Sequence, residues 1–262
     1  MSNITQAIWV ELLKARRSKM PLLTALGFSL APFAGGFFMI VMKDPDLARR
    51  LGLISAKAQI VAGSADWPTY LGLLAQATAI GGIILFSFVS SWVFGREYAD
   101  HTIKDLLALP TPRFVIVLAK FILVTLWSAA LTAVIYLIGL GVGAAVALPP
   151  ASAEIFWRGT ITLAITACLT IALVTPIAFF ACAGRGYLPP MGAAILALLL
   201  AQISAAAGWG EYFPWSVPAL YAGMAGAAYT HLGMISYVIV ISASLLGMIG
   251  TFAWWELADQ AY

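Results

Sequence analysis

Six long stretches of the chain contain no Asp, Glu, Lys or Arg. They cover residues 20–42, 67–95, 121–153, 159–184, 186–210 and 212–255. A membrane-spanning helix needs roughly 20 predominantly apolar residues, and each of these stretches is long enough. The pattern therefore predicts six spans, at about residues 21–42, 69–94, 120–147, 158–182, 189–206 and 232–255. Proline is expected to interrupt the first span at Pro32 and the fourth at Pro176.

The segment before the first span has the pattern of an amphipathic helix. Its apolar residues recur at spacings of three and four, at Ile4, Ala7, Ile8, Leu12 and Ala15. Its basic residues gather toward the end, at Lys14, Arg16, Arg17 and Lys19. A basic amphipathic helix of this kind lies in the headgroup plane of an anionic leaflet. A basic flank that only fixes the topology of the first span would show the same residues.

The segment 207–231, before the last span, is too apolar for an ordinary loop and too broken by Pro and Gly for one helix. Irregular backbone at membrane depth must be covered by protein. A short re-entrant or interfacial element is therefore expected here, on the outer face. Its aromatic residues Trp209, Tyr212 and Trp215 are equally typical of an interfacial aromatic belt.

Composition narrows the class of protein. Of 262 residues, 62% are apolar and 10% are charged, and the mean hydropathy is +0.96. Soluble proteins carry roughly one charged residue in four, so a soluble enzyme, a nucleic-acid-binding protein and a disordered protein are excluded. The pieces outside the spans are shorter than an independent domain. The whole chain, 1–262, is therefore expected to be a single all-α transmembrane domain.

Lysine and arginine are unequally divided between the two sides of a six-span chain. With the N-terminus inside, the inner segments hold nine basic residues and the outer segments five, and the net charge of +3 falls on the inner side. The nine are Lys14, Arg16, Arg17, Lys19, Arg96, Lys104, Arg113, Lys120 and Arg185. Because basic residues favour the cytoplasmic side, both termini are expected in the cytoplasm.

The inner loop 94–120 contains a second amphipathic pattern. Its charged residues Glu97, Asp100, Lys104 and Asp105 alternate with Tyr98, Ile103, Leu106 and Leu107. The alternation predicts a short helix over 98–109, which ends before Pro110 because a residue that precedes proline disfavours the helical region. Such a helix suits docking into a partner's groove, and it also suits an elbow that lies on the lipid.

A spaced set of residues in this loop resembles a known family. The set is Glu97-Tyr98, Thr102, Leu106-Leu107, Pro110, Arg113 and Lys120. It is similar to the first cytoplasmic loop of type-2 ATP-binding-cassette (ABC) permeases, six-span subunits of bacterial efflux systems for bacitracin- and lantibiotic-like peptides, sodium or drugs. The resemblance extends to the chain length, the N-terminal helix with Glu11 and Lys14, and the segment 207–231. Family members often have glycine where this chain has His101.

The resemblance implies roles for particular residues. The family's coupling helix sits in a cleft of a separate ATPase subunit and transmits closure of the ATPase dimer to the spans. Glu97, Thr102 and Arg113 are then expected to anchor the loop, Tyr98, Lys104 and Asp105 to face the ATPase, and Leu106 to belong to the same coupling set. The family's outer element also suggests an extracellular gate at Trp209, Tyr212 and Trp215.

The sequence contains no Gly-Lys dipeptide and so no phosphate-cradling GxxxxGK[ST] loop. The chain is therefore not expected to be an enzyme or to bind a cofactor, and ATP and Mg are expected on two copies of a partner ABC ATPase. The other expected partners are a second copy of the chain or a related permease, and the bilayer of a bacterial inner membrane. No nucleic acid is expected as a partner. His231 has no second ligand near it in the sequence, so no metal site is expected.

No Asp, Glu, Lys or Arg lies deep in a predicted span, which argues against an ion-coupled carrier. The hydroxyl residues in the spans commonly serve only helix packing. Gln76 and Gln202 are better candidates for lining a pathway, because a buried amide needs partners.

The sequence predicts the permease subunit of an ATP-driven exporter that moves a hydrophobic or amphipathic substrate, such as a peptide antibiotic, drug or lipid-like molecule, out of the cytoplasm. Two alternatives remain at this point: a secondary carrier or channel, and a membrane anchor or sensor without transport.

Overall fold

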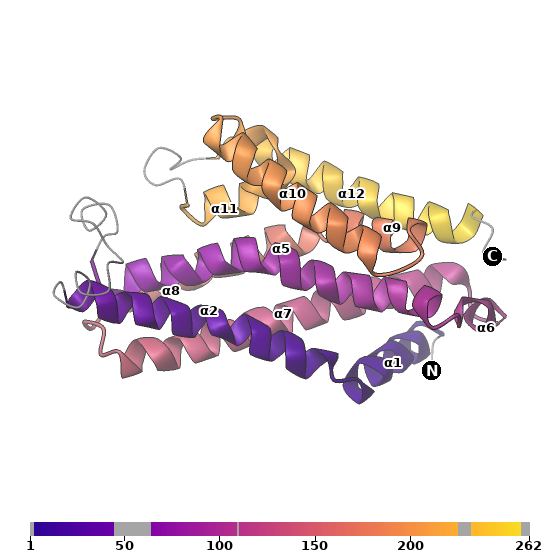
Figure 1. Cartoon of the computed structure of the whole chain (residues 1–262), viewed down its shortest axis with the longest axis horizontal. Coiled ribbons are helices and arrows are strands. Elements are labelled where there is room, and N and C mark those ends of the chain that lie inside the picture. The colour runs from indigo at the N-terminus through magenta and orange to yellow at the C-terminus, as the bar shows by residue number, and fades with distance from the viewer. Residues whose placement is uncertain (1–2, 45–63, 109, 225–231, 258–262) are drawn as a thin grey trace.

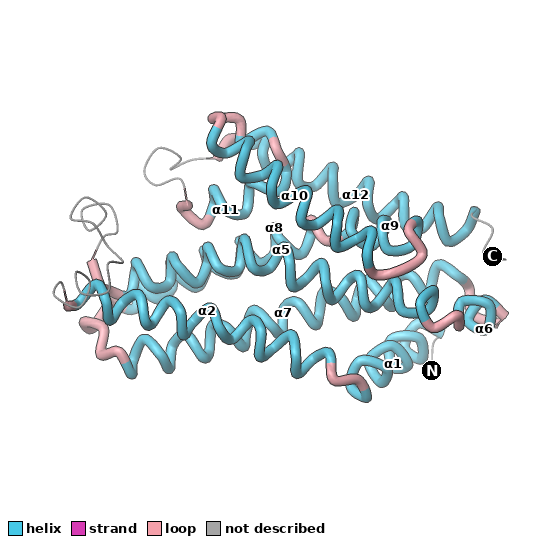
Figure 2. Tube along the Cα trace, in the orientation of Figure 1, coloured by secondary structure: helices cyan, strands magenta, loops and turns pink. Residues whose placement is uncertain are grey.

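The computed structural model describes residues 3–44, 64–108, 110–224 and 232–257. These residues form helices and loops, with no strand among them (Figure 2). Within the described ranges, six helical segments are long and apolar enough to cross a membrane. They are α2 (Met20–Lys43), α5 (Trp67–Ala99), α7 (Arg113–Ala145), α8 with α9 (Ala153–Ala172 and Thr175–Ala183), α10 (Leu188–Ala206) and α12 (Met234–Leu257). The predicted all-helical fold with six candidate spans is confirmed.

Shorter helices lie outside the spans. They are α1 (Asn3–Arg17), α6 (Ile103–Leu107), the 3-10 turns η1 (Gly210–Tyr212) and η2 (Pro214–Ser216), and α11 (Val217–Tyr221). Most of the loop expected between the first two spans, and His231, lie outside the described residues. The longer helices exceed their predicted ends, since α5 reaches Ala99 and α7 begins at Arg113.

Helix α5 runs through the middle of the bundle and packs against α2 and α7 on one side and against α9 and α10 on the other (Figure 1). Helices α5 and α7 are the most buried of the six candidate spans, whereas α10 and α12 are the least buried. Helix α1, helix α6 and the end of α12 lie at the same end of the bundle, which we call the terminal end (Figure 1). Helix α11 lies toward the opposite end.

The start of α5 shows how the sequence fixes a helix boundary. The carboxylate of Asp66 accepts a hydrogen bond from the Thr69 amide at 3.0 Å, and Pro68 occupies the first turn. Burial by itself would raise the pKa of Asp66, but hydrogen bonds from the Ser64 hydroxyl and from Thr69 outweigh it and lower the pKa. The cap is therefore an ionised carboxylate over the physiological pH range.

The two expected proline interruptions have different outcomes. Helix α2 passes through Pro32 without a break, and the Tyr70 hydroxyl of α5 donates to the Pro32 carbonyl at 3.0 Å. The fourth span breaks before Pro176, where α8 ends and α9 begins. Helix α12 makes a close approach at this break, because a Cβ added at Gly247 would lie 2.3 Å from the Pro176 nitrogen. A side chain smaller than methyl is therefore required there.

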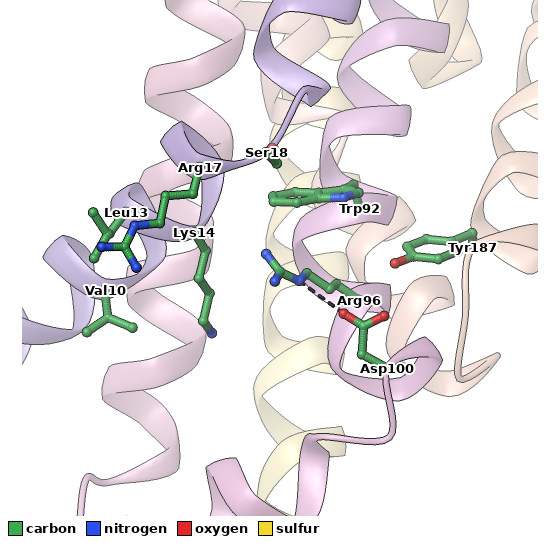
Figure 3. A pocket seen from close by; sticks show the side chains of 9 residues that line it. All are labelled: Val10, Leu13, Lys14, Arg17, Ser18, Trp92, Arg96, Asp100 and Tyr187. Atoms are coloured by element: carbon green, nitrogen blue, oxygen red, sulfur yellow. Dashed lines mark hydrogen bonds and ion pairs between the residues drawn. The ribbon is translucent and has the colours of Figure 1, made fainter.

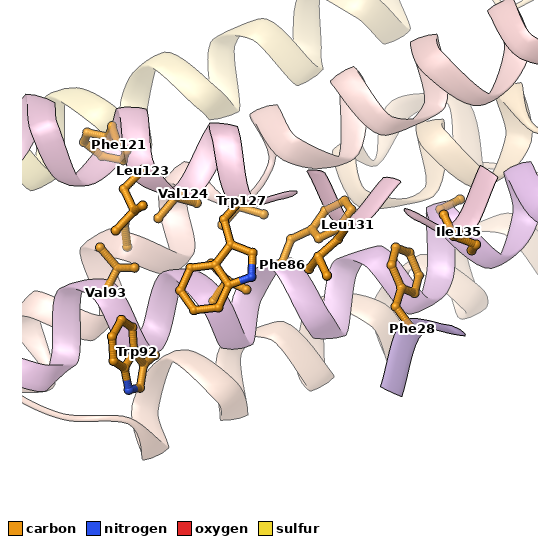
Figure 4. Packing of buried hydrophobic residues seen from close by; sticks show 14 of the residues in the cluster. Phe28, Phe86, Trp92, Val93, Phe121, Leu123, Val124, Trp127, Leu131 and Ile135 are labelled. Carbon is orange, nitrogen blue, oxygen red and sulfur yellow. The ribbon is translucent and has the colours of Figure 1, made fainter. Parts of the chain in front are cut away.

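Aromatic and aliphatic side chains fill the space between α5 and α7 (Figure 4). The Trp92 and Trp127 rings meet edge to face with centroids 5.7 Å apart. The Trp127 indole N–H donates to the Thr24 hydroxyl of α2 at 3.2 Å, so its polar atom is satisfied inside the core. This packing fixes the last turns of α5 relative to α7, and it thereby positions the charged residues that follow.

Candidate functional site

Four charged side chains meet at the terminal end, where α1 packs against α7 and reaches the last turn of α5. Glu11 and Lys14 come from α1, Glu97 from the last turn of α5, and Lys120 from a point two turns into α7. The Lys120 ammonium donates to Glu97 at 2.9 Å and to Glu11 at 3.3 Å, and also to the Val93 carbonyl at 2.8 Å. The Lys14 ammonium donates to Glu11 at 2.7 Å and to Glu97 at 2.8 Å. We call these four residues the charge cluster.

The charge cluster has two carboxylates and two ammonium groups, and three of its four residues are buried, whereas Lys14 is partly exposed. Lys120 has 0% of its surface exposed, Glu97 3% and Glu11 5%. Burial of charges is tolerated only when each is paired and its remaining hydrogen-bonding atoms are satisfied. Lys120 meets this condition, because its three N–H donors have three acceptors. The cluster ties α1 to both α5 and α7.

This geometry adds contacts that the sequence did not indicate. Lys120 was expected near the membrane re-entry of the third span and Glu11 on a surface helix, and both side chains are buried against other parts of the protein. Glu97 and Lys120 lie near those ends of α5 and α7 that meet at the terminal end. Both helices extend beyond their charge-free stretches, and the charged residues there pair with Glu11 and Lys14 of α1. That no charged residue lies deep in a span stays a prediction.

The loop after α5 differs from the single helix expected over 98–109. Helix α5 continues to Ala99, a turn follows, and α6 covers only Ile103–Leu107. The turn places His101 at a φ of +57°, in the left-handed region that favours glycine. The Thr102 amide then donates to the Glu97 carbonyl at 2.9 Å, which links the start of α6 to the end of α5.

The residues expected in the coupling set divide into buried and exposed groups. Tyr98 is buried with 8% of its surface exposed, so its expected place on the ATPase-facing surface is not the one it occupies. Ile103 is also buried, and Leu106 packs partly against the core. Lys104 and Asp105 are exposed, and they form the outward face of α6.

Arg113, expected as an anchor, joins the start of α7 to the end of α12. Its guanidinium donates to the carbonyl of Trp255 at 3.0 Å and to the carbonyl of Glu256 at 3.3 Å. Cationic groups stabilise the carbonyl-bearing end of a helix. Together with the charge cluster, this contact connects the loop that carries α6 to α1, α5, α7 and α12.

A second region lies near α11. A cavity of about 310 Å³ is lined by α5, α10 and the segment from η2 to Met224, and it includes Gln202, Trp215 and Ser216. Gln76 does not line this cavity, and its amide donates to the Ala222 carbonyl at 3.4 Å. Trp209 is 70% exposed and Tyr212 is 53% exposed. The structure thus brings Gln202 and Trp215 together and leaves the other two aromatic residues on the surface.

The residues of the cavity near α11 and those of the charge cluster differ in how well they can be predicted from the sequence. The candidate Gln202 could be found from its polarity within an apolar stretch. The charge cluster was missed because its partners are separated by as many as 109 residues, and no local pattern connects them. Among the described residues, no group of three His, Cys, Asp or Glu side chains is placed to hold a metal ion.

Comparison with known proteins gives two matches. Residues 7–201 match the family described as ABC-2 family transporter protein. The chain is also similar to the bacitracin transport permease protein BCRB of Bacillus licheniformis, with 26% identity over 182 residues. That match covers 68% of this chain and 85% of the relative. The family match includes the whole charge cluster, α6 and Gln76.

Proposed function

We propose that this chain, which belongs to the ABC-2 family of transporter proteins, couples a separate ABC ATPase to export of an amphipathic substrate. The chain is a multi-pass permease subunit and is not itself an ATPase. Two ATPase subunits, each holding ATP and Mg, act on a pair of permeases, either two copies of this chain or this chain with a related one. Both termini lie on the cytoplasmic side of a bacterial inner membrane, so the terminal end faces the ATPases.

The observation that carries the proposal is the attachment of the loop that carries α6 to four longer helices, through Glu97 and Arg113. Lys104 and Asp105 project outward from α6, whereas Ile103 on the same helix is buried. An exposed charged face on a short helix whose apolar face is held by the core is suited to a groove in a partner. A movement of α6 passes to α5 through the turn at Thr102, and to α1 and α7 through Glu97.

The cavity with Gln202 and Trp215 supports a substrate pathway on the α5–α10 face. Its lining is mostly apolar with a few polar groups, which is typical of sites for amphipathic molecules. The relative is named as a transport permease for the peptide antibiotic bacitracin. We propose that this chain exports a hydrophobic or amphipathic compound of the same general kind, with antibiotic resistance as one outcome. The outer exit of the pathway is bordered by Trp209, Tyr212 and Trp215. Gln76 holds the segment after α11 in place through its hydrogen bond to the Ala222 carbonyl.

The buried charges of Glu97 and Lys120 are one observation in favour of the main alternative, an ion-coupled secondary carrier. The closed pairing of the cluster argues against it, since each Lys120 donor already has an acceptor. A non-transporting anchor or sensor is the other alternative. All three classes give different results in the same vesicle experiment.

The experiment reconstitutes the permease with its co-expressed ATPase and measures substrate accumulation with ATP present, without ATP, and after collapse of the proton gradient. The test variant is Lys104→Glu with Asp105→Lys, which reverses both exposed charges of α6. We expect ATP-dependent transport that survives collapse of the proton gradient and is abolished, together with ATPase co-purification, in the variant. The matched control is Arg158→Glu, an exposed substitution at the N-terminal end of α8, which leaves both unchanged. Transport that persists without ATP, or no transport with an ATPase that co-purifies normally, would refute the proposal.

A further inference from the structure

A cavity of about 510 Å³ opens at the terminal end beside the charge cluster. Helix α1 forms one wall with Lys14 and Arg17, and the last turns of α5 form the other with Trp92 and Arg96 (Figure 3). Tyr187, just before α10, closes a third side. We call this cavity the basic pocket.

The unused hydrogen-bonding capacity of the basic pocket is cationic. Arg17 is exposed and makes no ion pair with any residue that the structure describes. Arg96 uses its Nε for the Asp100 carboxylate at 3.2 Å, and its two terminal nitrogens face the cavity without an ion pair to any residue that the structure describes. Lys14 gives two of its three N–H groups to Glu11 and Glu97, which leaves one donor.

A charge count indicates what the pocket would accept. Lys14 belongs to the charge cluster, which sums to zero. The other charged lining residues are Arg17, Arg96 and Asp100, which sum to a single positive charge. Guanidinium groups bind phosphate through two parallel N–H donors, and they do so more readily than other cations. One positive charge matches a phosphodiester, which carries one negative charge.

The surroundings of the pocket are those of a membrane surface. The Trp92 ring lies under the Arg96 guanidinium at 5.1 Å from the ring centroid, and tryptophan and tyrosine are enriched where spans leave the hydrocarbon. On α2, which begins two residues after the pocket residue Ser18, Leu22 and Leu26 are each more than half exposed. Exposed leucines on the adjoining span provide apolar surface for acyl chains.

We propose that the basic pocket binds the phosphodiester headgroup of an anionic lipid, with Arg17 and Arg96 as the phosphate ligands. A bound lipid connects α1 to α5 and to the start of α10, and it lies directly against Lys14 of the charge cluster. The position of α1, which the cluster fixes from inside the protein, is then also fixed from the bilayer. The inference requires only that the chain resides in a membrane, and it does not depend on ATP coupling.

The test is native mass spectrometry of the full-length chain in detergent, titrated with phosphatidylglycerol, phosphatidylcholine or inorganic phosphate. The variants are Arg17→Gln and Arg96→Gln, and the matched control is Arg16→Gln, an exposed neighbour on α1 that does not line the pocket. Loss of a charge-assisted hydrogen bond weakens binding about tenfold or more, so each variant is expected to bind phosphatidylglycerol about tenfold more weakly. The control is expected to bind it as the unmodified chain does. Arg96→Lys keeps the charge without the planar fork and is expected to recover part of the loss.

The titrations with phosphatidylglycerol and with inorganic phosphate distinguish a lipid headgroup from a soluble phosphate as the bound group. Binding of phosphatidylglycerol without binding of inorganic phosphate identifies a lipid headgroup, whereas arginine-dependent binding of inorganic phosphate supports the same chemistry and identifies a soluble ligand. Equal weakening by Arg16→Gln, or no effect of Arg17→Gln and Arg96→Gln, overturns the proposal. Because Arg17 is exposed and unpaired within the described chain, Arg17→Gln tests the pocket even where Arg96→Gln impairs folding. None of these results depends on transport, so failure here is distinguishable from failure of the proposed function.

Discussion

Replacing Lys120 with methionine removes the ammonium group at the centre of the charge cluster while keeping a side chain of similar length. The carboxylates of Glu97 and Glu11 and the carbonyl of Val93 then lose a donor inside the protein. Removing one partner of a buried ion pair costs about 3–5 kcal/mol, because the remaining charge stays buried and uncompensated. We expect the free energy of unfolding to fall by about this amount.

A matched pair elsewhere in the chain provides the control. Arg158 and Glu154 are 2.7 Å apart, close to the 2.9 Å of Lys120 and Glu97, but their side chains are 78% and 70% exposed. Exposed ion pairs contribute about 0–1 kcal/mol, so Arg158→Met should cost less than about 1 kcal/mol. The two substitutions break ion pairs of similar length that differ in burial, and Lys120 has two further acceptors, Glu11 and the Val93 carbonyl.

The assay is equilibrium unfolding of the purified chain in mixed micelles, with Lys120→Met, Glu97→Gln and the double variant measured as a cycle. The double variant removes the buried excess charge, so it is expected to be more stable than Lys120→Met alone. The reasoning would be refuted by a Lys120→Met cost no larger than that of Arg158→Met. A coupling free energy near zero between Lys120 and Glu97 would also refute it.

Three further substitutions test local features. His101→Gly is expected to raise the free energy of unfolding by about 1 kcal/mol, because it relieves a left-handed backbone at a residue with a Cβ, and a lower melting temperature would contradict this. Gly247→Ala is expected to destabilise the chain by about 1–3 kcal/mol, because its Cβ would overlap the Pro176 backbone, whereas Gly141→Ala, which meets no neighbouring atom, should be neutral or slightly stabilising in the same thermal scan. Asp66→Ala is expected to cost about 1 kcal/mol at pH 7 through loss of the α5 cap. Because the pKa of Asp66 is lowered in the folded chain, that cost should disappear as the pH falls through the folded-state pKa, and a cost independent of pH would exclude an ionised cap.

The parts of the fold that could be predicted from sequence are those with a local physical cause. Charge-free length alone located the six candidate spans, and the apolar spacing of residues 4–15 anticipated the helix α1. The effect of proline was less predictable, since α2 continues through Pro32 whereas Pro176 coincides with a break. A proline inside a continuous helix removes one hydrogen bond, but Pro176 lies in the first turn of α9, where the missing N–H has no helical acceptor to lose.

The candidate site was less accessible to sequence reasoning because its contacts join distant segments. Glu97 and Arg113 could be singled out, but their partners could not. The burial of Tyr98 also depends on how far α5 continues, which the amphipathic pattern of the loop did not indicate. Charged residues at the end of an apolar stretch look the same in a sequence whether they face the headgroups or one another.

The spacing of the charge cluster along the chain has a consequence for biosynthesis. Glu11 leaves the ribosome 109 residues before Lys120, and Lys14 leaves it 83 residues before Glu97. During this interval α1 has none of its buried partners, and its apolar stripe and basic end must be accommodated at the membrane surface. Docking of α1 is therefore completed only after α7 has been made, although α1 is translated before α2, α5 and α7.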